Sequence, residues 1–190
     1  MRTGVALGLV AVALGSTAAA ASGDVWKRLH RPLHVPQLAA AAHCPVSAAD
    51  GRFDFTRYGV GEGIGRGPVY PVMAGGVLGL VSGQGTEFAG SAWGGQKTLW
   101  FVSPRYKGPV LIRGRRVGPA GFVRFGRATV PAAELRILSG TSMNGNPGVA
   151  DRGQRYLPSY TRLREPGCYA FQVDGLTFSY PVVFRAELSN

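Results

Sequence analysis

Two cysteines, Cys44 and Cys168, are the residues whose chemistry the sequence defines most narrowly. Their wide separation suits neither a zinc site nor a redox pair, because both need clustered thiols. In an exported chain an even cysteine count favours a disulfide, and two cysteines allow only one pairing. The sequence therefore predicts a Cys44–Cys168 bridge that ties an N-terminal arm to the body; two buried free thiols are the alternative.

A group of arginines in the middle of the chain could bind anions, since guanidinium groups match carboxylate and phosphate oxygens. The group consists of Arg113, Arg115, Arg116, Arg124 and Arg127. Strand alternation places Arg113 opposite Ile112, toward solvent. Ordinary outward-facing strand charge, which also protects sheet edges from pairing, is the interpretation that we favour. With a formal net charge of +11, the alternative is that this surface binds an anionic envelope polymer or lipid. No specific nucleic acid is expected because no dense basic run exists.

The usual catalytic motifs are not met. Residues 140–145 have one residue too many for a nucleophile elbow. Three histidines fall in the N-terminal arm, at His30, His34 and His43. Pro32 and Pro36 forbid the helix that would align His30 with His34, so no metal site is expected. We therefore expect no enzyme and no cofactor, with a hydrolase that uses an unrecognised carboxylate site as an alternative.

The first 21 residues have the order of a secretory signal peptide. Arg2 supplies a positive charge, residues 5–14 are apolar, and residues 19–21 are alanines that fit a cleavage site. The apolar stretch is short for a bilayer span. We expect cleavage before Ser22 or, at an equally suitable site, before Ala21, and a secreted, periplasmic or wall-associated product that does not span the membrane; an uncleaved N-terminal anchor is the alternative.

Two further regions follow, an extended N-terminal arm over residues 22–52 and a β-domain over residues 53–190. The 29 Gly and 13 Pro favour turns over long helices. Short apolar or alternating segments between turns predict strands. They cover residues 53–58, 69–73, 77–81, 97–102, 110–113, 121–125, 134–138, 160–163, 168–173 and 178–184.

Two turns are predicted from their residues. Gly75 and Gly76 separate two of the strand segments, and Asp174 with Gly175 is typical of a two-residue type I′ hairpin. In the strand before that hairpin, Tyr169, Phe171 and Val173 share one face. The pattern predicts an all-β, antiparallel sandwich of about seven to nine strands.

Residues 166–175 resemble the penultimate strand and final hairpin of immunoglobulin-like domains. Tyr169 follows Cys168, whereas antibody domains place the tyrosine two residues before the cysteine, and Trp100 stands where a core tryptophan would. With residues 93–97 and 108–114, the chain resembles a family of uncharacterised exported bacterial proteins over about residues 30–187. The resemblance implies an exported, non-catalytic immunoglobulin-like module with a binding or structural role, and it assigns no site.

Overall fold

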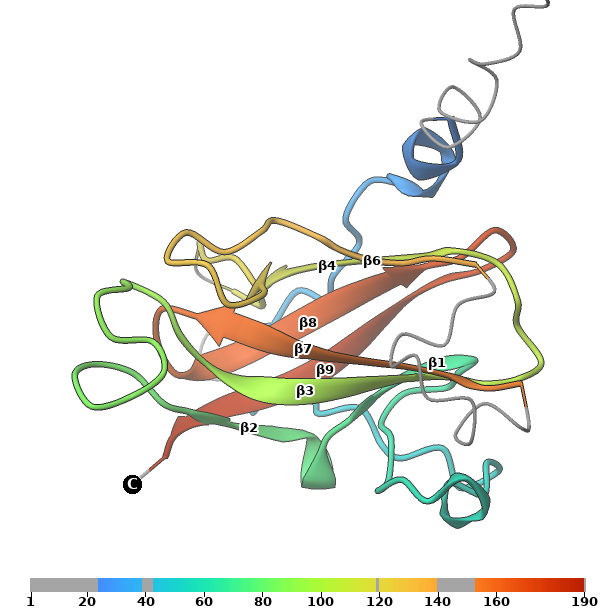
Figure 1. Ribbon diagram of the computed structural model, residues 1–190, viewed down its shortest axis with the longest axis horizontal. Helices are drawn as coiled ribbons and strands as arrows, with labels where there is room; N and C mark the ends of the chain where they lie inside the picture. Colours follow the sequence, from blue (N-terminus) through green and yellow to red (C-terminus); the bar gives the residue numbers. More distant parts are fainter. Residues whose placement is uncertain (1–23, 39–42, 119, 140–152, 190) are drawn as a thin grey trace, which may run out of the picture.

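Strands dominate the computed structural model, which describes residues 24–38, 43–118, 120–139 and 153–189. The predicted signal peptide and residues 140–152 lie outside the described residues. The strands form two sheets that pack as a sandwich, which confirms the all-β class (Figure 1).

The first sheet has the strand order β1-β3-β7-β5. Its members are β1 (Val69–Val72), β3 (Gly94–Val102), β7 (Arg155–Leu163) and β5 (Arg124–Phe125). The second sheet has the order β2-β9-β8-β4-β6. Its members are β2 (Val77–Leu80), β9 (Ser179–Leu188), β8 (Gly167–Asp174), β4 (Val110–Arg116) and β6 (Leu135–Ile137).

The core lies between the sheets and is built by strand alternation. Tyr169, Phe171 and Val173 of β8 all point into it, as predicted. Trp100 of β3 is fully buried, and its ring centre lies 4.9 Å from that of Phe171. Burying each such side chain contributes about 1.5–3 kcal/mol, so these rings are a main source of the sandwich's stability.

The two strands on either side of Gly75 and Gly76 do not pair, and the predicted wholly antiparallel arrangement is wrong. β1 and β2 do not form a hairpin about Gly75 and Gly76, because the short 3-10 helix η2 (Ala74–Gly76) carries the chain from one sheet to the other. β2 then pairs with β9 in parallel, Val77 opposite Arg185, so the second sheet is mixed instead of wholly antiparallel.

The predicted strand at residues 53–58 is also wrong. The segment ends in a 3-10 helix, η1 (Thr56–Tyr58), and its rings cover the outer face of the first sheet. Phe53 and Phe55 both pack on Tyr70 of β1, with ring centres 5.4 and 5.0 Å away. The alternating aromatic pattern therefore reflects contact with a sheet face and not membership of the sheet.

The final hairpin differs from its prediction as well. Asp174 pairs with Ser179, so the connection holds four residues, and Gly175 does not adopt a positive φ. Its N–H donates to the carbonyl of Phe178 at 2.9 Å. A Cβ on Gly175 would lie 2.3 Å from Cζ of Phe178. The glycine is needed because the phenylalanine ring lies against it, and a type I′ turn is not the reason.

The N-terminal arm lies along the outer face of the second sheet (blue in Figure 1). Residues 24–29 are helical, and Trp26 and Leu29 pack on Leu111 of β4. Farther along, Ser47 and Val183 of β9 exchange two hydrogen bonds of 2.9 Å each. Contacts along the described parts of the arm thus cover a face that the sandwich alone would expose.

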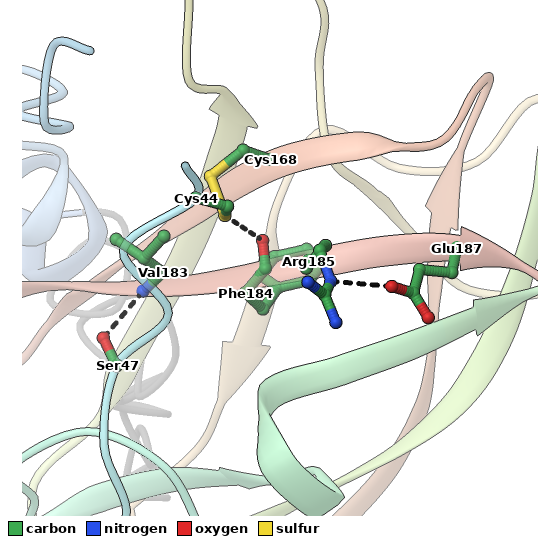
Figure 2. Close-up of a disulfide and its surroundings, with 7 residues drawn as sticks. All are labelled: Cys44, Ser47, Cys168, Val183, Phe184, Arg185 and Glu187. Atoms are coloured by element: carbon green, nitrogen blue, oxygen red, sulfur yellow. Dashed lines mark hydrogen bonds and ion pairs between the residues drawn. A yellow bond between two sulfur atoms is a disulfide. The ribbon is translucent and has the colours of Figure 1, made fainter. Parts of the chain in front are cut away.

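The predicted disulfide is present, with 5.4 Å between the Cα atoms of Cys44 and Cys168 (Figure 2). The bridge lies among Ala170, Val183 and other side chains on the outer face of β8 and β9. It joins the arm to the penultimate strand and does not link the two sheets across the core.

Candidate functional site

Arg113 lies in a buried polar cluster, so the prediction that it faces solvent is wrong. Its side chain is 8% exposed. Its Nη2 donates to Asp174 Oδ2 at 2.8 Å and to the carbonyl of Arg31 at 2.5 Å. Alternation does place Arg113 on the outer face of β4, but the arm covers that face, and the guanidinium is engaged inside the protein.

The backbone of Arg115 and Arg116 lies beside the segment that leads to Arg124. The chain turns back on itself after β4, so that Arg115 forms a β-bridge with Phe122. In the same turn, the N–H of Arg116 donates to the carbonyl of Gly121 at 2.9 Å. This fold-back brings the end of β4 next to β5, which begins at Arg124.

A hollow of about 390 Å³ lies beside this turn. We call it the arginine–aromatic pocket and define it by Trp93, Phe122, Arg124, Arg164 and Tyr169. The guanidinium carbons of Arg164 and Arg124 lie 4.7 and 5.7 Å from the ring centre of Trp93. Arg124 also lies 5.1 Å from the ring of Phe122, which is 58% exposed. Cation–π contacts of this kind position a guanidinium without neutralising it.

The charge of the pocket comes from two arginines. In the part of the chain that the structure describes, the guanidinium groups of Arg124 and Arg164 make no hydrogen bond or ion pair. The carboxylate of Glu165 also lines the pocket, but it is paired with Arg116. Burial raises the pKa of Tyr169, whose neutral hydroxyl donates to the carbonyl of Glu165 at 2.8 Å. An anionic group that enters the pocket would meet two unpaired guanidinium groups.

Arg162 holds the walls of this pocket in place, although no sequence pattern identified it. Its side chain is fully buried and donates to five acceptors from two loops, and it lies over a phenylalanine ring. The acceptors are Ser91 Oγ and the carbonyl oxygens of Trp93, Gly94, Gly126 and Ala128. The loop that carries Trp93 and the loop after Arg124 are therefore fixed to one buried cation.

Of the five predicted arginines, Arg124 alone lines the pocket, and Arg127 lies elsewhere. It pairs with Glu87 at 3.5 Å and lies 5.3 Å from the ring centre of Tyr160. Arg164 and Phe122 belong to the pocket but were not predicted, because a basic residue after a strand has no distinguishing pattern. The buried position of Arg162 depends on a long-range pairing that the sequence does not show: Gly95 pairs with it, and a Cβ on Gly95 would lie 2.8 Å from Arg162 Cδ.

Among the described residues, no group of three or more histidine, cysteine, aspartate or glutamate side chains is arranged to hold a metal ion. Nor does any helix among them have the length and apolar character needed to cross a membrane.

The chain was compared with family models, with curated proteins and with solved structures, and none of the three comparisons gave a match.

Proposed function

We propose that the protein is an exported, non-catalytic module with an immunoglobulin-like sandwich, and that it binds an anionic polymer of the cell envelope. The observation that carries this proposal is the pair Arg124 and Arg164, whose guanidinium groups lie over one Trp93 ring and have no ion-pair partner among the described residues. The disulfide supports export, since such bonds persist in oxidising compartments.

The chemistry of the pocket favours a polymer that combines anionic groups with apolar faces. Guanidinium groups take carboxylate or phosphate oxygens in bidentate pairs. The exposed ring of Phe122 offers a flat apolar surface beside them, on which the C–H face of a sugar ring can pack. A charged glycan or glycan phosphate satisfies both features, whereas a small inorganic anion would use only the arginines.

A binding role is better supported than hydrolysis. Glycoside hydrolysis needs two carboxyl groups that face the same bond. Among the described lining residues, Glu165 supplies one carboxylate, and its partner is Arg116. The pocket therefore offers guanidinium donors for binding an anion, but its described lining lacks the two facing carboxyl groups that glycoside hydrolysis needs.

The test is retention of the secreted protein on an immobilised sulfated polysaccharide over a range of salt concentrations. The Arg124→Gln/Arg164→Gln variant should elute at lower salt and show a smaller salt dependence, because fewer counterions are released. A matched Arg28→Gln/Arg57→Gln variant loses the same charge from exposed positions outside the pocket. If the two double variants elute at the same salt concentration, retention depends only on net charge, and the proposal is overturned.

A third variant tests whether retention depends on the shape of the pocket or only on the net charge of the protein. Phe122→Ala leaves the charge unchanged, so the proposal expects weaker retention with an unaltered salt dependence. Vesicles that contain an anionic phospholipid are the second probe. Stronger binding to the vesicles than to the polysaccharide would favour the lipid alternative over the polymer.

A further inference from the structure

We propose a second, separate oxyanion site at the opposite end of the sandwich, formed by Arg52, Arg66 and Arg105. These three residues line a hollow of about 290 Å³ together with Asp50 and other residues of the same loops. The site is independent of the arginine–aromatic pocket, with which it shares no residue. Its ligand is a compact oxyanion, of which a phosphate group is the best match.

Strand pairing explains why three distant arginines converge. Val69 at the start of β1 pairs with Val102 at the end of β3, which brings the segment before β1 beside the turn after β3. Arg66 and Arg105 come from these two segments. A β-bridge between Ala49 and Ile64 adds the end of the N-terminal arm, which carries Arg52. The fold therefore gathers charge that is scattered along the sequence.

The backbone around this hollow is fixed by hydrogen bonds. Ser103 is buried, its N–H donates to the carbonyl of Pro68 at 2.8 Å, and its Oγ accepts from the N–H of Arg105 at 3.4 Å. Asp50 accepts from the hydroxyl of Tyr70 at 2.8 Å and from the N–H of Arg52 at 3.1 Å. The three arginines thus project from anchored turns.

The guanidinium groups themselves are uncommitted. Throughout the described ranges, those of Arg52, Arg66 and Arg105 make no hydrogen bond or ion pair. Arg66 has one ring contact, 5.6 Å from the centre of Tyr180. Asp50 is the one carboxylate among the lining residues, so three positive charges face one negative charge. That excess and the small volume favour an oxyanion with more than one charge, which accepts several N–H donors at once.

The two sites lie at the two ends of β3, which runs along the length of the sandwich (Figure 1). Trp93 of the first pocket directly precedes this nine-residue strand, and Ser103 beside the second directly follows it. At about 3.3 Å per residue the strand separates the sites by about 30 Å. One small anion cannot occupy both, so each site can be tested separately.

The experiment is a titration of the isotope-labelled, disulfide-intact protein with inorganic phosphate at constant ionic strength, followed by amide and arginine NMR signals. Saturable shifts should concentrate at Arg52, Arg66, Gly67, Ser103 and Arg105. Titrations with sulfate and with acetate form the other arms. Phosphate is expected to bind most tightly, and a stronger response to acetate would overturn the assignment to phosphate.

Matched variants complete the test. Arg52→Gln/Arg66→Gln/Arg105→Gln should lose the localised shifts, and Arg66→Gln or Arg105→Gln alone should weaken binding about tenfold. Arg28→Gln/Arg124→Gln/Arg164→Gln has the same net charge and should retain the localised shifts. Amide dispersion reports whether each variant is folded. Shifts spread evenly over the surface, or localised shifts that survive the first triple substitution, would overturn the proposal without bearing on the arginine–aromatic pocket.

Discussion

Arg113 and Asp174 form an ion pair beneath the N-terminal arm, with 2.8 Å between Nη2 and Oδ2 and side chains 8% and 0% exposed. Asp174 also accepts from the side chains of Gln172 and Ser179. Arg31 of the arm donates to the carbonyl of Phe178 at 2.6 Å and lies 3.5 Å from Asp174 Oδ1. One buried carboxylate therefore joins the arm, β4 and the final hairpin.

Replacing Asp174 should destabilise the protein strongly. Asp174→Ala leaves the buried Arg113 guanidinium without its anion, a loss of about 3–5 kcal/mol in the free energy of unfolding. Denaturant unfolding monitored by circular dichroism measures it. The double variant Arg113→Met/Asp174→Leu should recover much of the loss, because neither charge is then buried alone. An unchanged midpoint for Asp174→Ala would contradict the assigned role.

The disulfide should contribute a large part of the stability. It closes a loop with a sequence separation of 124, for which chain-entropy arguments give about 5 kcal/mol as an upper value. Cys44→Ser/Cys168→Ser should therefore unfold at clearly lower denaturant. Non-reducing peptide mapping should yield one crosslinked peptide from the native protein. Reductant should lower the midpoint of the native protein and leave that of the double variant unchanged; free thiols in the folded protein would refute the bridge.

Gly175→Val should cost about 1–3 kcal/mol of stability, since the new side chain meets the ring of Phe178. Gly51→Val is the matched control, because nothing lies within 4 Å of a Cβ at that position. Combining Gly175→Val with Phe178→Ala should reduce the additional effect of the valine. Equal midpoints for Gly175→Val and Gly51→Val would contradict the close contact with the ring.

Stability should fall at alkaline pH because of two tyrosines. Burial raises the pKa of Tyr70 and of Tyr180 well above the ordinary value of 10.0. Above that value the unfolded chain loses these protons while the folded protein keeps them, so the free energy of unfolding decreases as pH rises. The full contribution of the two tyrosines to the free energy of unfolding is present at pH values below the ordinary tyrosine pKa.

An alkaline titration monitored by tyrosinate absorbance and circular dichroism together tests this dependence. The two buried phenols should ionise only as the protein unfolds. Tyr70→Phe and Tyr180→Phe should each make stability fall less steeply with pH. Ionisation of either tyrosine at an ordinary midpoint in a folded protein would count against the expectation.

The sandwich could be predicted because β-strand alternation is a local property. The inward face of β8, from Tyr169 to Val173, followed directly from the order of residue types, whereas the core position of Trp100 followed from the resemblance to immunoglobulin-like domains. Connections between sheets are not local. Nothing around Gly75 and Gly76 shows whether the next strand pairs with its neighbour or crosses to the other sheet, and the actual partner of β2 is the distant β9.

The candidate sites were only partly predictable for the same reason. Arg124 was named, yet its partner Arg164 reaches the same Trp93 ring from another strand end. Arg113 was assigned to solvent because alternation gives the face of a strand and not what covers that face. The second basic hollow was missed entirely, since Arg52, Arg66 and Arg105 become neighbours only through long-range pairing.

The strand order of the second sheet also constrains when the protein can fold. Two strands late in the chain, β8 and β9, occupy its interior, with β2 on one side and β4 with β6 on the other. Until residues 167–188 have been synthesised, β2 and β4 have no strand to join them within this sheet. The second sheet therefore cannot form step by step during synthesis and assembles only after β8 and β9 have been made.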